Sequence, residues 1–365
     1  MRVSDLLEKT KIWRKTMLGL FEQPTRCLIV AGLCSIAASG TAQAQDYTKV
    51  TLRSAQALPE SYPPAAATAY FNERLAEESG GDMTVNMFWG GVLGGDNEAL
   101  PLVSKGAVDI SGIVPGYFNT QLPLMSMTNA LPHTFFDPEY AMRALAKMSS
   151  ENADLNAEYE AVGIKPLVFR FLPNYQFYCT SPVQTMEDIE GLKVRSFGNY
   201  IPRMMESLGA VPVNVTTADV YEALNRGSLD CSYSPMTDAA SFKLHEVAEY
   251  LIDLPMGGIA ANVDVMNLET FNSLSPDSQE LITKLGAEAT DWWAEQSQEK
   301  ADEALQTMKE GGLEVVEFKE ADKLRETVPD MVSIWQDVMT ERGMGDVGAS
   351  YSEALMDYYN ANATE

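Results

Sequence analysis

Strand-like and helix-like segments alternate along most of this chain, and this alternation is the feature that most limits its fold. Short apolar or alternating runs are followed by stretches with apolar residues at helical spacing. The expected strands are residues 49–55, 83–89, 108–114, 165–171, 175–180, 192–196 and 211–215. Such alternation is typical of α/β proteins, in which helices flank parallel sheets.

The helices expected between these strands are residues 65–79, 98–105, 138–149, 152–161, 201–208 and 217–225. The longest helical pattern covers residues 275–309, where no proline follows Pro276 and Gly286 is the one internal glycine. We expect a single bent helix there. No long linker or low-complexity segment divides the chain, so two lobes would have to share crossing strands.

The N-terminal segment has the pattern of a secretory signal peptide. Residues 1–44 contain six basic and three acidic residues, and an apolar run of twelve residues covers 27–38. The segment closes with Ala42-Gln43-Ala44, an A-x-A cleavage site. Twelve apolar residues are too few to span a membrane. We therefore expect export and cleavage near Ala44; the alternative is a short buried core segment.

The charge of the chain excludes several classes of function. Lys and Arg number 26 against 52 Asp and Glu, which gives a net charge of −26 that repels nucleic-acid phosphates. The two histidines, His133 and His245, and the four cysteines have no zinc-ligand spacing. We expect no metal, no cofactor and no nucleic acid. After cleavage Cys179 and Cys231 remain, as a disulfide or as two buried thiols.

Familiar catalytic motifs are missing. No G-x-S-x-G elbow, phosphate-binding P-loop or G-x-G-x-x-G motif occurs, and the glycine-rich stretch 90–95 lacks the Lys-Ser/Thr of a P-loop. Carboxylates are abundant, so an exported hydrolase with a carboxylate pair stays open as an alternative.

Residues 105–115 and 226–235 echo each other. Each stretch has a glycine, a small residue, an apolar residue and an aspartate, then a short strand and a proline. The echo is either a coincidence of two common turns or the sign of two similar lobes that face one cleft. Ligands of open α/β sheets lie beyond the carboxyl ends of strands, so residues 114–117 and 232–235 are candidate pocket walls.

An ordered set of motifs resembles a known family. The set comprises Gly191-Leu192-Lys193-Val194-Arg195, residues 208–213 (LGAVPV) and residues 220–230 (VYEALNRGSLD), with 90–95, 106–109 and 267–274 as weaker members. Together they resemble the substrate-binding protein of tripartite ATP-independent periplasmic (TRAP) transporters of the DctP type, over nearly the whole exported chain.

The resemblance implies a two-lobed α/β periplasmic binding protein fold with crossing hinge strands and a long lobe-spanning helix. Residues 45–172 and 260–300 would form lobe I, and 173–259 and 301–365 lobe II. The lobes would close on a small organic acid anion, and the protein would deliver it to two integral membrane subunits. It would be a periplasmic monomer without enzymatic activity. A sensor that presents its ligand to a receptor is the alternative.

The resemblance also implies site residues. In this family the arginine of the G-L-K-x-R motif, here Arg195, grips the ligand carboxylate, and a guanidinium can do so through two parallel hydrogen bonds. Ser234 stands where many members have asparagine, and Tyr175, followed by Gln176, where several have a second arginine. The expected site therefore has one positive charge fewer than the site of those members. A ligand that is a monocarboxylate or a zwitterion is favoured over a dianion.

The remaining ligand candidates are aromatic or acidic. The resemblance implies that the loop after the first strand, which holds Glu60, Ser61 and Tyr62, touches the ligand. Glu60 could meet a ligand cation; the alternative is a solvated loop residue. Trp89, Tyr117 and Phe118 end strands near the expected cleft, where aromatic rings could stack on an apolar ligand or surround a cation. Phe197, which follows the strand of the Arg195 motif, is a further ligand candidate. Ordinary packing is the alternative for each ring.

Overall fold

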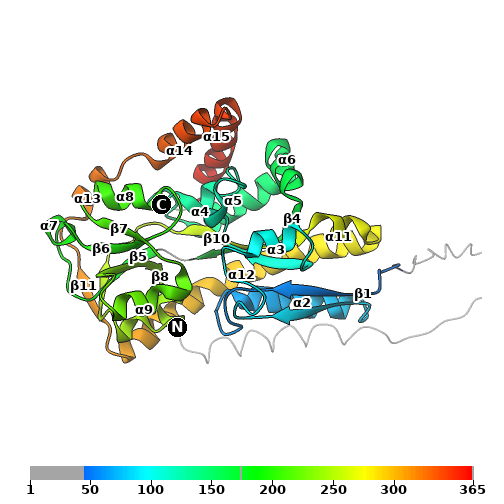
Figure 1. The fold of residues 1–365 in the computed structure, drawn as a ribbon, viewed down its shortest axis with the longest axis horizontal. Coiled ribbons are helices and arrows are strands. Elements are labelled where there is room, and N and C mark those ends of the chain that lie inside the picture. Colours follow the sequence, from blue (N-terminus) through cyan, green and yellow to red (C-terminus); the bar gives the residue numbers. More distant parts are fainter. Residues whose placement is uncertain (1–44, 173–174, 364–365) are drawn as a thin grey trace, which may run out of the picture. The chain divides into compact units, whose positions relative to one another are not determined.

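The computed structural model describes residues 45–172 and 175–363, which form two mixed sheets with helices around them (Figure 1). The expected signal peptide, residues 1–44, lies outside the described residues. Among the residues that are described, no helix is both long enough and apolar enough to cross a membrane.

The first sheet has five strands in the order β2-β1-β3-β10-β4. In chain order they are β1 (Val50–Ala55), β2 (Met83–Phe88), β3 (Ile110–Ile113), β4 (Ile164–Leu172) and β10 (Ile259–Asn267). Strand β1 pairs in parallel with β2 and β3, whereas β10 lies antiparallel between β3 and β4.

The second sheet has six strands in the order β11-β9-β5-β8-β6-β7. They are β5 (Tyr175–Cys179), β6 (Lys193–Ser196), β7 (Val211–Asn214), β8 (Cys231–Pro235), β9 (Tyr250–Asp253) and β11 (Glu314–Glu317). Strand β6 is parallel to β7 and β8, and β9 is parallel to β11, whereas β5 is antiparallel to both of its neighbours, β8 and β9.

The antiparallel strands add to the parallel pairing that the alternation of strands and helices predicted. The chain passes from β4 in the first sheet to β5 in the second, and it returns from β9 to β10. Parallel neighbours need a crossover helix, but these strands enter directly from the other sheet, so they run against their neighbours. Crossing strands are what the sequence predicted.

Fourteen α-helices occur among the described residues. They are α2 (Ala65–Glu78), α3 (Ala99–Ser104), α4 (Met127–Ala130), α5 (Pro138–Glu151), α6 (Ala153–Val162), α7 (Met186–Ile189), α8 (Ile201–Ser207), α9 (Val220–Asn225), α10 (Met236–Ser241), α11 (Leu268–Ser273), α12 (Pro276–Glu310), α13 (Ala321–Thr327), α14 (Met331–Glu341) and α15 (Gly345–Asn362).

Helix α12 is the long helix that the sequence predicted. The Ser275 side chain caps its first turn by accepting a hydrogen bond from the Ser278 N–H. Gly286 lets it approach β4, because a Cβ atom there would lie 2.4 Å from the Leu167 carbonyl oxygen. Its first half packs in the core of the first sheet through Trp293, and its last turns reach a core beside the second sheet through Met308.

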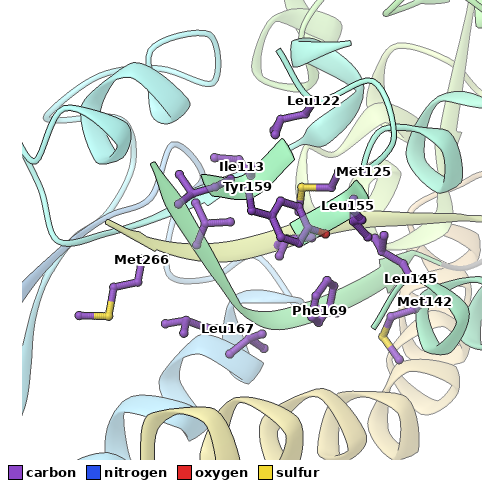
Figure 2. Packing of buried hydrophobic residues seen from close by; sticks show 14 of the residues in the cluster. Ile113, Leu122, Met125, Met142, Leu145, Leu155, Tyr159, Leu167, Phe169 and Met266 are labelled. Carbon is purple, nitrogen blue, oxygen red and sulfur yellow. The ribbon is translucent and has the colours of Figure 1, made fainter. Parts of the chain in front are cut away.

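The core of the first sheet also includes the C-terminal helices. Figure 2 shows part of this core, where Met142 and Leu145 of α5 and Phe169 of β4 lie close together. Trp335 of α14 and Tyr351 of α15 are buried in the same cluster. Residues 331–362 therefore pack with the first sheet, whereas the sequence-based division placed 301–365 in lobe II. Packing of this kind has no local sequence signal.

The two echoing stretches make the same contacts in the two sheets. The Asp109 carboxylate accepts a hydrogen bond from the Arg53 N–H, and the Asp109 N–H donates to the Arg53 carbonyl. Asp230 and Lys193 repeat both bonds in the second sheet. Each aspartate thereby ties a helix-to-strand turn to the neighbouring parallel strand, so the two sheets carry equivalent turns.

A disulfide links the ends of two paired strands. Cys179, the last residue of β5, lies opposite Cys231, the first residue of β8, and their sulfur atoms are bonded. The bond closes a loop with a sequence separation of 52 residues, which includes β6 and β7. Of the two states left open by the sequence, the structure contains the disulfide.

Candidate ligand-binding site

Arg195 is a buried cation near the carboxyl end of β6. Its side chain is 1% exposed, and Lys193-Val194 before it belong to the same strand. Nη1 donates to the Tyr233 carbonyl at 2.9 Å, Nε donates to the Val215 carbonyl at 3.2 Å, and Nη2 donates to Thr217 Oγ1 at 3.1 Å. All three acceptors are neutral, so they orient the guanidinium without balancing its charge.

The Arg195 guanidinium has no ion-pair partner within 4.0 Å among residues 45–172 and 175–363. The other buried guanidinium, that of Arg170, is paired with Asp264 at 2.7 Å. A guanidinium has five N–H donors, and three of those of Arg195 are used. A buried charge without a counter-charge is strongly unfavourable. The site is therefore suited to an anion that accepts from the two remaining N–H groups.

Aromatic rings from both sheets surround this cation. The Phe197 ring centre lies 4.7 Å from Cζ of Arg195, and the Tyr117 ring meets Phe197 edge-on at 5.6 Å. Tyr117 belongs to the short 3-10 helix η2 (Pro115–Phe118), which follows β3 of the first sheet. The ring centres of Tyr175 and Tyr233 lie 4.7 Å apart with the rings tilted by 40°, and the Tyr175 ring centre lies 6.5 Å from that of Phe197. The structure thus brings together four of the predicted residues.

Tyr62 forms a hydrogen bond between a loop that follows a strand of the first sheet and a helix that follows a strand of the second sheet. Its hydroxyl donates a hydrogen bond of 2.9 Å to Asp238 Oδ1, and Asn262 Nδ2 donates to the same hydroxyl at 3.4 Å. Tyr62 follows β1, whereas Asp238 belongs to α10, which follows β8. Burial raises the pKa of the Tyr62 phenol, and the Asp238 carboxylate raises it further.

Two aspartates that the sequence did not single out lie in the field of Arg195. Burial raises the pKa of the Asp238 carboxyl to about 6, against the effects of the Tyr62 hydrogen bond and of Arg195. Burial also raises the pKa of Asp96 to about 6, and again Arg195 acts in the opposite direction. Both carboxyls are therefore held where their charged forms are poorly solvated.

Trp89 and Asp96 line a cavity of about 20 Å³, which is room for one water molecule. Its wall comes from connections and strands of the first sheet and includes the buried Tyr62. The other lining residues are Gln56, Ala57, Leu58, Ala65, Gly112, Arg170 and Asn262.

A larger polar cavity of about 220 Å³ is lined by Tyr117, whose ring contacts Phe197. Thr216 lines it beside Val215, whose carbonyl accepts from Arg195. Asn119 also lines it, is 6% exposed, and has a buried Oδ1 without a hydrogen-bond partner among the described residues. The remaining lining residues are Asn97, Gly116, Thr120, Gly198, Asn199 and Asn214.

The structure gives less direct support for three of the predicted ligand residues, Gln176, Ser234 and Glu60. Gln176 of β5 is opposite Ser234 of β8 in the sheet register, and both are buried. The Ser234 hydroxyl bonds with Ser232 Oγ at 2.6 Å, while Gln176 Oε1 has no partner among the described residues. Glu60 is exposed. No cluster of three or more His, Cys, Asp or Glu that could hold a metal occurs in the described part of the chain.

The raised pKa of Asp238 leads to a pH-dependent prediction. The native pKa of about 6 lies above the unfolded value of about 3.9, so the protonated form favours folding. Its contribution to stability is complete below about pH 4 and is lost as the pH rises through about 6. Relative to wild type, ligand-free Asp238→Asn should gain up to about 3 kcal/mol between pH 4 and pH 8.

Urea unfolding of both proteins across this pH range measures the difference. Asp302→Asn, an exposed change on α12, is the matched control and should follow wild type at every pH. A stability difference between Asp238→Asn and wild type that does not change with pH would contradict the assignment of this titration to Asp238.

Comparison with known proteins decides the family. A model of the bacterial extracellular solute-binding proteins of family 7, DctP, matches residues 54–341. The chain belongs to this family. It is a TRAP-type solute-binding protein, a transport receptor and not an enzyme, so the hydrolase considered from the sequence is excluded.

Relatives and solved structures agree with this family. The 2,3-diketo-L-gulonate-binding periplasmic protein YiaO of Escherichia coli K12 is 27% identical over 300 residues, which are 80% of this chain and 87% of that protein. The C4-dicarboxylate-binding periplasmic protein DctP of Rhodobacter capsulatus is 26% identical over 316 residues, 86% of this chain and 90% of that protein.

A TRAP periplasmic solute-binding protein from Sulfitobacter sp. NAS-14.1, solved with bound β-D-galacturonate, has a TM-score of 0.71 to this chain. The two chains are 23% identical. The match covers 85% of this chain and 100% of the Sulfitobacter chain. The expected fold class, a two-lobed α/β binding protein with crossing strands and a long helix, is confirmed.

Proposed function

We propose that this TRAP solute-binding protein captures a small organic acid anion and that Arg195 binds the ligand's carboxylate. One observation carries the proposal: a fully buried guanidinium has neutral acceptors for three N–H groups and no ion-pair partner in the described chain. A carboxylate supplies both the missing charge and two acceptors in the geometry of a guanidinium.

The names of the relatives support an acidic ligand. One is named for 2,3-diketo-L-gulonate, one for C4-dicarboxylates, and the Sulfitobacter protein was solved with galacturonate. All of these compounds are carboxylates, although they differ in size and charge. At 23–27% identity the shared feature that we carry over is the carboxylate alone.

Two contacts support a mechanism of lobe closure. The Tyr62–Asp238 hydrogen bond and the Tyr117–Phe197 ring contact each join a segment that follows a first-sheet strand to one that follows a second-sheet strand. We assign this arrangement to the closed form, in which the Phe197, Tyr117 and Tyr175 rings exclude water from Arg195. Separation of the two contacts would open the path to Arg195.

The cellular role follows from family and sequence together. Residues 1–44 would direct export, cleavage near Ala44 would release a periplasmic monomer, and two integral membrane subunits would receive the ligand. A sensor would use the same site. Ligand uptake by vesicles that contain the two membrane subunits separates these roles, because a sensor would not stimulate uptake.

A thermal-shift screen of residues 45–365 against small carboxylates, sulfonates and zwitterions tests the proposed ligand class. A ligand at a hundred times its Kd should stabilise the protein by about 2.7 kcal/mol, which raises the unfolding midpoint. Mass spectrometry of the denatured protein detects a ligand retained from expression. If no carboxylate shifts the midpoint and none is released, the proposal fails.

A further inference from the structure

The groups around Arg195 also limit what the rest of the ligand can be; this inference rests on the proposed function. Beyond the guanidinium, the surroundings of the site include two carboxylates and an amide oxygen that can accept hydrogen bonds. Asp238 has one carboxylate oxygen bonded to Tyr62, and the half-buried Asp96 lies in the cavity beside Trp89. The amide oxygen of Asn119 is buried, belongs to a residue that lines the larger cavity together with Tyr117, and has no partner among the described residues.

A second carboxylate on the ligand would find no other free buried cation among the described residues. Arg170, which lines the smaller cavity, bonds through Nη2 to Asp264 at 2.7 Å and through Nη1 to Thr68 at 2.8 Å. Arg342 donates to the Asn119 carbonyl, but it is exposed and does not line the larger cavity. A second anionic group near Asp238 and Asp96 would therefore face like charges.

We propose that the ligand is a monocarboxylate whose other polar groups are hydrogen-bond donors, either hydroxyls or an ammonium, and that Asp238, Asp96 and Asn119 accept hydrogen bonds from them. The same two aspartates exclude dicarboxylates by repulsion. Affinity for a carboxylate comes from Arg195, and selection among carboxylates comes from the acceptors, as in sites that reject a competitor by an unfavourable charge.

Matched pairs of compounds test this selection by isothermal titration calorimetry on residues 45–365. D-Gluconate and D-glucarate differ only in a terminal hydroxymethyl or carboxylate group, and D-galactonate and galactarate differ in the same way. 4-Aminobutyrate and succinate form the ammonium pair. The donor-bearing member of the pair that fits should bind at least about tenfold more tightly, a difference of about 1.4 kcal/mol.

Variants assign the selection to the aspartates. Asp238→Asn and Asp96→Asn should each bring the ratio of the two Kd values closer to one, whereas the exposed Asp302→Asn should leave the ratio unchanged. If Asp238→Asn does not fold, the half-buried Asp96→Asn carries the same test. The hydroxyl and ammonium pairs also show which donor the site takes.

The outcomes separate this inference from the proposed function. Tighter binding of a dicarboxylate, or an unchanged Kd ratio in both aspartate variants, overturns the inference alone. If none of the six compounds binds, the test is the compound that the protein releases on denaturation. A compound with one carboxylate group and hydrogen-bond donors supports the inference, and a compound with two carboxylate groups overturns it. If no carboxylate binds and none is released, the proposed function fails and the inference fails with it.

Discussion

Replacement of Arg195 by alanine should lower the affinity for the carboxylate ligand by about 2–5 kcal/mol, roughly 30- to 5,000-fold. The loss is large because the ligand carboxylate would remain buried without its cation. The guanidinium of Arg195 is the one buried guanidinium of the described residues without a carboxylate partner. Isothermal titration calorimetry with a hit from the thermal-shift screen measures the change.

Two further variants serve as controls for the Arg195→Ala result. Arg195→Lys keeps the positive charge but cannot offer two parallel N–H groups, so its affinity should lie between those of wild type and Arg195→Ala. Arg143→Ala removes a partly exposed arginine paired with Glu139 and Asp291 and should leave binding unchanged. Urea unfolding checks that each variant is folded. Wild-type affinity in folded Arg195→Ala would remove Arg195 from the site.

Loss of the disulfide should be the largest single effect on stability. Its loop has a sequence separation of 52 residues, and chain-entropy arguments for a loop of that length give about 4 kcal/mol. The double variant Cys179→Ala/Cys231→Ala should therefore unfold with a free energy about 2–4 kcal/mol below that of wild type. Alanine is the suitable replacement, because both cysteines are buried and a serine would bury a hydroxyl.

Thiol chemistry provides the control for this comparison. Residues 45–365 contain no cysteines besides Cys179 and Cys231, so denatured oxidised protein should expose no reactive thiol and reduced protein should expose two. Reduction should destabilise the wild-type protein and leave the double variant unchanged. Two reactive thiols in freshly purified, unreduced protein would contradict the bond.

Patterns that lie within one segment predicted the fold well. The long helix was expected over residues 275–309 and covers Pro276–Glu310, because its cap, its first-turn proline and its spacing are all local. The burial of Arg195 near the end of a strand also agrees with the motif that marked it. These features need no knowledge of distant partners.

Features that depend on distant pairing could not be predicted. Cys179 faces Cys231 only because β5 and β8 pair antiparallel in one register, which neither strand's sequence contains. Asp238 and Asp96 were hidden among 52 acidic residues, and burial alone distinguishes them. Asn119 gave no signal, because an isolated asparagine is usually part of a turn.

The position of β10 has a consequence for biosynthesis. This strand lies between β3 and β4, yet the whole run from β5 to β9, which belongs to the other sheet, precedes it in the chain. A nascent chain that ends before Ile259 therefore has β3 and β4 with no strand between them. The first sheet is completed only when Asn267 of the 365 residues has been made, and the second only when β11 (Glu314–Glu317) has been made. Most of the polypeptide is therefore synthesised before either sheet can form a finished native core.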